Sequence, residues 1–494
     1  MKKEDLFEAL GDIDEEKVKA AGEYRKQMKP VGIRRGIAAL CAAAVLIVLT
    51  LSGIFTQKPA DTADVNMPSE PEPSVTHEPS GRPLEMIKVM AAYPEAAEPD
   101  TGTAEFMESD AHWKWMDSMQ ENIAASRQLQ GDMENYYMAM MGKMLEDDDA
   151  NTVCSPLNIY IALGMLAEVT DGTSRQQILD LLNTGDIETL RNNIHTLWNS
   201  NYADTPALKS LLADSIWLNN AYSYKQDTMQ RLADIYYASS FSGVPGTEEM
   251  NEELRKWTDD NTGGLLHEYV QGLELSPQTV MALVSTIYYK AMWNSDFNPK
   301  NTSEELFHGI KGDTKVNMMH MTDLLGVYRT DAFTSIGLSL TDSGAMHFYL
   351  PNEGKEINDL VSDPDIIKAT KSVYDEHRTN AIVHMSIPKF NVSSKTNLTD
   401  VMKELGITDV FEQHTADFSP LSDDTDIYVD KAEHAAMVEI DEHGVVGAAY
   451  TALITEGAAE VSEEIDFVLD RPFMFVITGA DGSVLFTGIV RNIE

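Results

Sequence analysis

Residues 438–452 read VEIDEHGVVGAAYTA and join a strand-like segment to a run of small, uncharged residues. A second stretch, residues 470–492, reads DRPFMFVITGADGSVLFTGIVRN. Both stretches are rich in β-branched and aromatic residues between turn formers, which is typical of strands. These two stretches therefore place antiparallel strands at the C-terminal end of the chain.

Further strand signals occur upstream, and helical signals lie mostly in the first half of the chain. Helical spacing in residues 133–145 puts Met133, Tyr137, Met141 and Met144 on one face, which favours core packing over a metal site. This order predicts an α+β fold with large antiparallel sheets. The predicted strands are residues 215–220, 280–290, 344–351, 381–392, 435–444, 465–478 and 482–492.

Composition excludes several classes of protein. The chain has 494 residues with a formal net charge of −43, and 43% of its residues are hydrophobic. A large buried core is therefore available, and the negative charge disfavours nucleic acid and anionic membrane surfaces as main partners. The only cysteines, Cys41 and Cys154, cannot build a disulfide framework or a zinc ribbon.

The N-terminal segment predicts a membrane anchor. Residues 36–55, GIAALCAAAVLIVLTLSGIF, carry no charge and are long enough to cross a bilayer as a helix. Basic residues precede this run, so the positive-inside rule places residues 1–35 in the cytoplasm. A cleaved signal peptide is the alternative. Residues 56–119, rich in Pro, Ser, Glu and Thr, are predicted to be an extracellular linker to a domain over 120–494.

Sequence motifs of enzymes are absent. The chain has no G-x-S-x-G, H-E-x-x-H, P-loop or G-x-G-x-x-G motif. The acidic run at residues 146–149 lacks the spacing of a calcium loop. We therefore expect neither catalysis, nor a metal, nor a cofactor, although a Ser/His/Asp triad assembled in space is not excluded by local motifs.

Two long blocks and several shorter ones resemble the serpin family. Residues 151–178, NTVCSPLNIYIALGMLAEVTDGTSRQQI, resemble the serpin block that begins N-x-x-x-S-P, and residues 434–492 resemble its C-terminal block. Shorter blocks at residues 213–218, 283–293, 346–351, 387–390, 404–411 and 416–419 follow in the family's order. The matching positions of the first block are Asn151, Ser155, Pro156, Leu157, Ala162, Leu163, Gly172, Gln177 and Ile178.

The resemblance implies a serpin fold: a large central sheet, further sheets, surrounding helices and an exposed reactive loop. It also implies suicide inhibition, in which a protease acylates the loop and the loop then enters the main sheet as a strand. The hinge positions that the family pattern gives are Glu442, Gly444, Val445, Gly447, Ala448, Ala449 and Thr451.

Alternation along the loop fits insertion. Every second residue of an inserted strand faces the core, and those positions are Val445, Gly447, Ala449, Thr451, Leu453 and Thr455. None is charged, whereas Tyr450 falls on the outward face. Departures at His443, at the two valines and at Gly447 leave open a non-inhibitory serpin with an ordinary small-residue loop.

The scissile bond is predicted between Ala458 and Ala459, about seventeen residues beyond the hinge glutamate in the family pattern. A small apolar residue fits the shallow pocket of an elastase-like protease. No Lys or Arg occurs between Lys431 and Arg471, so a trypsin-like target is disfavoured. Cleavage after Glu456 or Glu460 by an acid-specific protease is the alternative.

Two further sites are predicted to control sheet opening. The resemblance assigns Ser155, Asn158, Asp214 and His434 to the region called the shutter, and Trp293, Lys389 and Glu442 to the region called the breach. We expect Asp214 and His434 to form a charge-assisted pair, with a neutral buried His as the alternative.

Taken together, these features predict a monomeric, membrane-anchored serine protease inhibitor on a bacterial cell surface. Its partner would be an elastase-like protease of a host or a competing bacterium. A non-inhibitory serpin that acts as a surface binding protein is the main alternative, and a hydrolase with a non-local triad is the third hypothesis.

Overall fold

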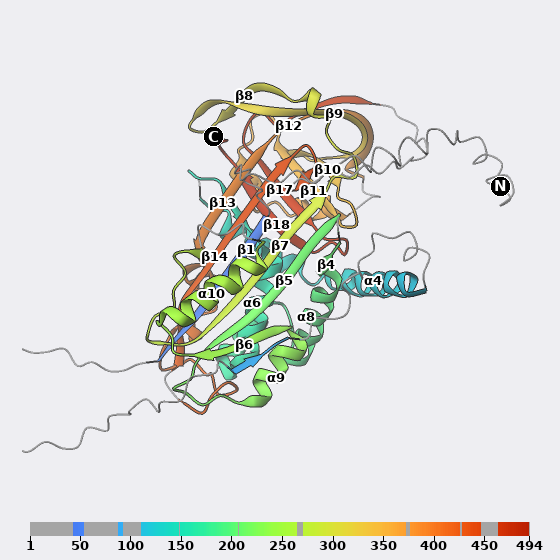
Figure 1. The fold of residues 1–494 in the computed structure, drawn as a ribbon. Coiled ribbons are helices and arrows are strands. Elements are labelled where there is room, and N and C mark those ends of the chain that lie inside the picture. The colour runs from blue at the N-terminus through green and yellow to red at the C-terminus, as the bar shows by residue number, and fades with distance from the viewer. Residues whose placement is uncertain are drawn as a thin grey trace, which may run out of the picture. The chain divides into compact units, whose positions relative to one another are not determined.

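A computed structural model describes residues 43–53, 87–91, 110–147, 149–205, 207–263, 270–371, 376–424, 427–445 and 463–493. All of them belong to one compact unit, Cys41–Glu494. The predicted α+β class is confirmed, because this unit combines helices with two large sheets whose strand pairs are mostly antiparallel (Figure 1).

The main sheet has nine strands among the described residues, and its long members run side by side in Figure 1. Its centre runs in the order β14, β1, β7, β5, with neighbouring strands of this group antiparallel. Short β15 lies between β14 and β7, in line with β1. The strands are β1 (Ala43–Gly53), β2 (Ile87–Val89), β4 (Ala203–Asp204), β5 (Leu208–Asn219), β6 (Ala238–Gly243), β7 (Thr279–Met292), β13 (Phe390–Asn397), β14 (Ile427–Asp441) and β15 (Gly444–Val445).

A second sheet of nine described strands lies toward one end of the main sheet and packs against it (Figure 1). Strand β16, which follows the predicted reactive loop, forms its edge and pairs in parallel with β12. The strands are β3 (Thr152–Cys154), β8 (Ser303–Gly309), β9 (Gly312–Arg329), β10 (Phe333–Ser339), β11 (Ala345–Pro351), β12 (Arg378–Pro388), β16 (Glu464–Val468), β17 (Phe473–Thr478) and β18 (Val484–Val490).

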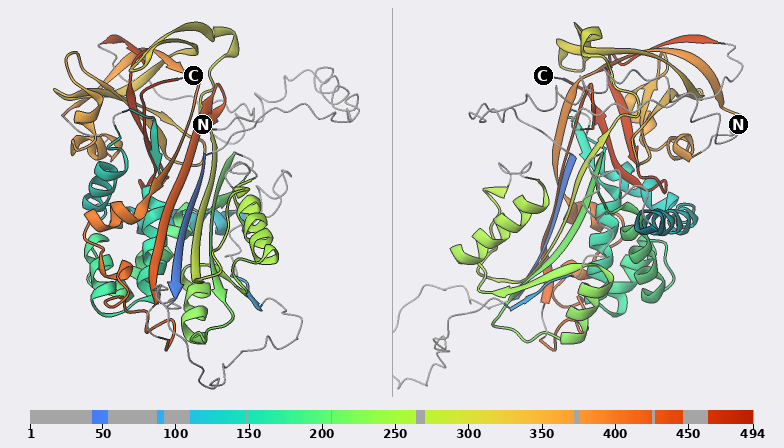
Figure 2. Two further views of the ribbon diagram at one scale, coloured as in Figure 1. Left: turned by 90° about the vertical axis from the view of Figure 1, so that its left-hand side faces the viewer. Right: turned by 45° about the vertical axis from the view of Figure 1, so that its right-hand side comes forward.

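Helices cover both faces of the main sheet (Figure 2). Helix α10 (Glu248–Asn261) lies on one face, while α6 (Pro156–Val169) and α8 (Ile187–Asn201) lie on the other. The remaining helices are α4 (Asp110–Leu129), α5 (Glu134–Met144), α7 (Gly172–Leu181), α9 (Gln226–Ile235), α12 (Ile357–Leu360), α13 (Asp365–Lys371) and α14 (Leu398–Glu404), with 3-10 turns η1 (Pro299–Asn301) and η2 (Asp409–Phe411).

Helix α6 is the buried helix that supports the centre of the main sheet. Ser155 caps its N-terminus by accepting a hydrogen bond from the backbone N–H of Asn158, and Pro156 fits the first turn because that turn needs no N–H donor. All its residues are buried, as expected for a helix whose residues are mostly apolar on all sides.

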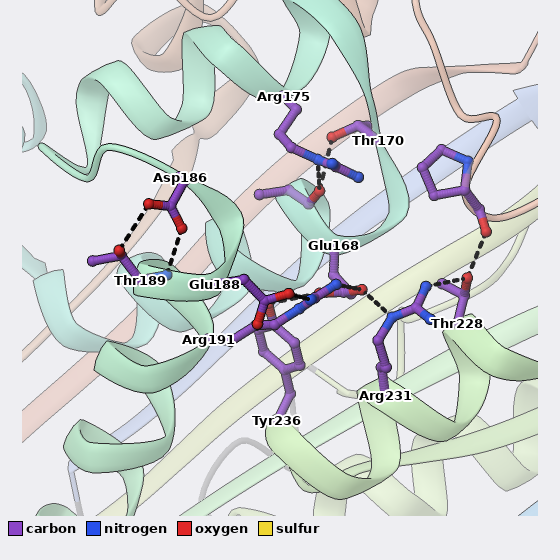
Figure 3. A network of polar contacts seen from close by, with 12 residues as sticks. Glu168, Thr170, Arg175, Asp186, Glu188, Thr189, Arg191, Thr228, Arg231 and Tyr236 are labelled. Carbon is purple, nitrogen blue, oxygen red and sulfur yellow. Dashed lines mark hydrogen bonds and ion pairs between the residues drawn. The ribbon is translucent and has the colours of Figure 1, made fainter.

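One charged residue of α6, Glu168, ties this helix to α8 and α9 (Figure 3). Its side chain is fully buried and accepts hydrogen bonds from Nε and Nη2 of Arg191 at 2.7 Å each and from Nε of Arg231 at 2.6 Å. Burial raises the pKa of the Glu168 carboxyl, but the two guanidinium groups more than offset this, so its pKa lies below the usual value. The ion pairs fix α6 against both neighbouring helices.

The helix predicted over residues 36–55 is not present among the described residues, because Ala43–Gly53 forms strand β1. Within those residues, none of the helices has both the length and the hydropathy needed to cross a membrane. The rest of the predicted span lies outside the described ranges. The sequence did not distinguish the two structures, because a central strand with a neighbour on each edge is typically as uncharged and apolar as a membrane helix.

The predicted linker contains two ordered elements. Residues 87–89 form β2, which pairs with β6, and α4 begins at Asp110. The rest of 56–109, apart from residues 87–91, lies outside the described ranges.

In helix α5, which follows α4, the methionine face packs into the core as predicted, since Tyr137 and Met141 are fully buried.

Candidate functional site

The hinge of the predicted reactive loop lies at the end of β14. After Asp441 the chain turns and enters β15, where Val445 is opposite Ile440 of β14 and Ala291 of β7. Gly444 has a φ of 150°, and a Cβ there would lie 2.2 Å from the carbonyl oxygen of Ala291. Only glycine allows this approach, so the sequence directs the chain between β14 and β7.

Glu442, the predicted hinge glutamate, is held by charged and polar partners. Its Oε2 lies 2.8 Å from Nζ of Lys389, and its Oε1 accepts a 2.8 Å hydrogen bond from Oγ1 of Thr302. Burial raises the pKa of the carboxyl, but these hydrogen bonds more than offset it and lower the pKa. The predicted Lys–Glu pair of the breach is therefore present, and Thr302 is a third member that sequence motifs did not indicate.

Trp293, the other predicted breach residue, anchors the same turn. Its indole Nε1 donates to the carbonyl oxygen of Asp441 at 2.9 Å. Its backbone N–H donates to the carbonyl oxygen of His443 at 3.1 Å. The unusual His443 places Nδ1 3.2 Å from Oδ2 of Asp296. The hinge thus begins from a rigid turn although His replaces the acidic residue of the family pattern.

The shutter connects α6 to the middle of the main sheet. Nε2 of His434, on β14, accepts a 3.1 Å hydrogen bond from the backbone N–H of Ser155. Asn158 makes two bonds to Ser285 of β7: Nδ2 donates to the Ser285 carbonyl oxygen at 3.3 Å, and Oδ1 accepts from its Oγ at 2.6 Å. Ser285 was missed by motif matching. A polar serine inside the mostly apolar run of residues 280–290 was the feature of the sequence that could have indicated this site.

The predicted pair of Asp214 with His434 is wrong for this structure. Asp214 lies opposite Ser285 of β7, Ser285 lies opposite Ile47 of β1, and Ile47 lies opposite His434. Three strand spacings of about 4.8 Å separate the two residues, roughly 14 Å in all. Asp214 Oδ1 and His434 Nδ1 are both buried without a hydrogen-bond partner.

Burial therefore determines how both groups titrate. Burial raises the pKa of the Asp214 carboxyl to about 7. It lowers the pKa of His434 to about 3. These directions are the reverse of those expected for a charged pair, because no opposite charge compensates for the lost hydration of either group.

The remaining predicted site residues lie outside the described ranges. They are Gly447, Ala448, Ala449 and Thr451 of the hinge and Ala458 and Ala459 of the scissile bond. The described chain resumes at Glu463, whose backbone carbonyl accepts from Ile382, and continues into β16. Both ends of the predicted loop therefore leave from ordered strands, one in each sheet.

Comparisons with known proteins agree with this arrangement. The family model described as serpin (serine protease inhibitor) matches residues 133–493. Serpin-ZX of Arabidopsis thaliana is 28% identical over 75% of this chain and 98% of its own length. Alpha-1-antitrypsin of Meriones unguiculatus is 30% identical over 70% of this chain and 86% of its own. The native state of the thermophilic serpin tengpin superimposes with a TM-score of 0.63 at 22% identity, covering 73% of this chain and 93% of tengpin.

A two-sheet fold with the hinge, breach and shutter described above, together with a family match over most of the sequence, defines the class. The chain belongs to the serpin family. Members of this family are in general protease inhibitors rather than enzymes, and serine proteases are their usual targets.

Proposed function

We propose that this serpin inhibits an elastase-like serine protease by trapping it as a covalent complex. The observation that carries the proposal is the hinge: β15, the last described strand before the predicted loop, already pairs with both β14 and β7 of the main sheet. The residues beyond Val445 suit continuation as a strand, since none of the alternate positions up to Thr455 is charged.

Target class follows from the predicted scissile bond. Ala458 is small and apolar, which suits a shallow specificity pocket, and no basic residue lies between Lys431 and Arg471. Cleavage after Glu456 or Glu460 would instead indicate an acid-specific target.

The proposal includes a location in the cell membrane. The uncharged run over residues 36–55 and the basic residues before it support a membrane anchor, with the serpin domain outside the cell. We also propose that the protein acts as a monomer. A bacterial origin rests only on this N-terminal architecture and stays a prediction.

The test is to mix the purified full chain with pancreatic elastase and to separate the products under denaturing conditions. A complex that survives SDS, with a released fragment that starts at Ala459, supports the proposal. Cleavage of the loop with fully active elastase contradicts it. A released fragment that starts at another residue would place the scissile bond just before that residue.

A second candidate function is a non-inhibitory serpin that binds a partner at the cell surface. One observation favours it: strand β1 lies between β7 and β14, so the main sheet has no free place for the loop in this conformation. Elastase that neither cleaves the loop nor forms a complex would support this candidate.

A further inference from the structure

Strand β1 comes from far upstream of the serpin domain yet lies at the centre of the main sheet (Figure 1). It is antiparallel to β14 on one edge and to β7 on the other. Strand β15, the start of the reactive loop, pairs antiparallel with the same two strands. The loop and β1 are therefore directed into the same gap.

Strand register shows that they need the same positions. Val445 lies opposite Ala291 of β7 and Ile440 of β14. If the strand continued without a bulge, Ala448 would lie opposite Tyr288 and Met437. Those two residues are the partners of Ala44 in β1. In this continuation each loop residue from Ala448 onwards would correspond to one β1 residue from Ala44 onwards.

The next position repeats the match. Val45 lies between Ile287 of β7 and Ala436 of β14, both of which are buried. The same extension of the loop places Ala449 between these two residues. Because a sheet position pairs with one strand at a time, β1 and the inserted loop exclude each other.

The sequence of β1 suits two environments. Residues 43–53, AAVLIVLTLSG, carry no charge, and neither do the residues on either side within 36–55. Such a run can fill a central strand position with a neighbouring strand on each edge, or it can cross a bilayer as a helix. It cannot do both at once, since a spanning helix would take residues 43–53 out of the sheet.

We propose that Ala43–Gly53 is a removable internal strand that competes with the reactive loop, and that transfer of this segment into a bilayer frees the gap for loop insertion. This inference rests on the proposed inhibitory function. With β1 in place, a protease that attacks the loop is released, because the cleaved loop has no strand position to enter. With the segment in a membrane, the gap is open and trapping can proceed.

A disulfide reports the position of β1 without any measure of inhibition. Val48→Cys with Val284→Cys places two thiols on directly opposite residues of β1 and β7, whose Cα separation suits a disulfide. The matched control, Val48→Cys with Met281→Cys, is out of register because Met281 lies opposite Leu51. Cys41 is replaced by Ser, and Cys154 stays because burial raises the pKa of its thiol.

The full chain is oxidised in detergent-free buffer and in phosphatidylcholine vesicles, and the disulfide is located by peptide mass analysis. We expect the 48–284 bond in buffer, at least about tenfold less of it in vesicles, and none in the control. Absence of the bond in buffer, or equal yields of it in buffer and vesicles, overturns the inference.

A second measurement separates this inference from the proposed function. Elastase is added to the oxidised and reduced forms of the 48–284 variant in vesicles and to the variant Val45→Asp, with Val45→Ile as its control. We expect the SDS-stable complex to be lost on oxidation, restored on reduction and increased in buffer by Val45→Asp, which disfavours β1 in the sheet. Complex formation that is unchanged by oxidation overturns the competition. A 48–284 bond that forms as expected, with no complex in any form, overturns inhibition while leaving the position of β1 established.

Discussion

Asp214 and His434 show how strongly burial without a partner affects single residues of the main sheet. The strand order places Asp214 opposite Ser285, and no cation contributes to the shift of its pKa. The structure makes Asn158 and Ser285 the link between α6 and β7, with His434 attached to Ser155. Charge at Asp214 is therefore a cost to the folded state rather than a gain.

We predict opposite pH dependences for two variants at these positions. Because its pKa is raised, the Asp214 carboxyl contributes stability that is fully present below about pH 4 and is lost as the pH rises through about 7. Because its pKa is lowered, the His434 imidazole contributes stability that is fully present above pH 6.5 and is lost as the pH falls through about 3. As the pH rises from 4 to 7, the stability of Asp214→Asn should therefore increase relative to wild type, and that of His434→Gln should decrease relative to wild type.

Denaturant unfolding of both variants and wild type at pH 4, 5.5 and 7 measures these differences, and the comparison with wild type cancels other titrating groups. A charged Asp214–His434 pair would instead make Asp214→Asn lose stability relative to wild type as the pH rises from 4 to 5.5. That result would contradict the neutral, buried state of both groups.

A charge on an inward loop position should prevent insertion. Ala449→Glu would place a carboxylate between Ile287 and Ala436, at a cost of several kcal/mol, so elastase should cleave this variant and remain active. The matched variant Tyr450→Glu alters the opposite face and should keep most of the inhibition. The ratio of complex to cleaved serpin on denaturing gels measures both. Equal trapping by the two variants would refute the alternation of the loop.

Residue 458 should determine which protease is inhibited. Ala458→Arg supplies a guanidinium that can pair with the acid in the pocket of trypsin-like enzymes, so inhibition should move from elastase to trypsin. Second-order inhibition rates with the two proteases measure this change. Ala459→Ser is the control and should leave the preference for elastase unchanged. If Ala458→Arg still prefers elastase, the scissile bond lies elsewhere.

Helix α6 is the element on which the shutter depends, and Glu168 fixes it. We predict that Glu168→Gln destabilises the protein by roughly 2–4 kcal/mol, because Arg191 and Arg231 lose their buried partner. Glu188→Gln removes an exposed partner of the same Arg191 and should cost less than about 0.5 kcal/mol. Denaturant unfolding at neutral pH measures both. Equal effects would mean that burial of Glu168 contributes nothing.

Sequence patterns predicted most strands but not all of their breaks. The run at 280–290 became β7, and that at 482–492 became β18. The run at 381–392, by contrast, divides into β12 and β13 at Lys389, and this break brings the Lys389 ammonium to Glu442. Local propensity contains no information about a partner 53 residues away, so the break became visible only in three dimensions.

Two features of the structure could not be predicted from the sequence. The apolar run of β1 satisfies the requirements of a membrane helix and of a central strand equally well, so its composition could not separate the two. Asp214 matched a shutter position of the family pattern, but its distance from His434 depends on how many strands lie between them. Motif matching identifies positions and does not give strand order.

At the scale of the whole molecule, one gap in the main sheet has two candidate strands from opposite ends of the sequence. β1 precedes the family match at residues 133–493, and the reactive loop lies near its C-terminal end. We propose that the strand that fills the gap decides whether the protein traps a protease or is merely cleaved. The fold, the hinge and the proposed membrane segment are thus connected through a single strand position.

The most direct test of this account is to locate the cleaved loop by its register. Tyr450→Cys with Thr286→Cys, in vesicles and with Cys41 replaced, pairs a loop residue with the β7 residue it should face, as Leu46 of β1 does now. We predict that the 450–286 disulfide forms after elastase cleavage and not before. Cleavage in vesicles without that disulfide would contradict the claim that the loop enters the position of β1.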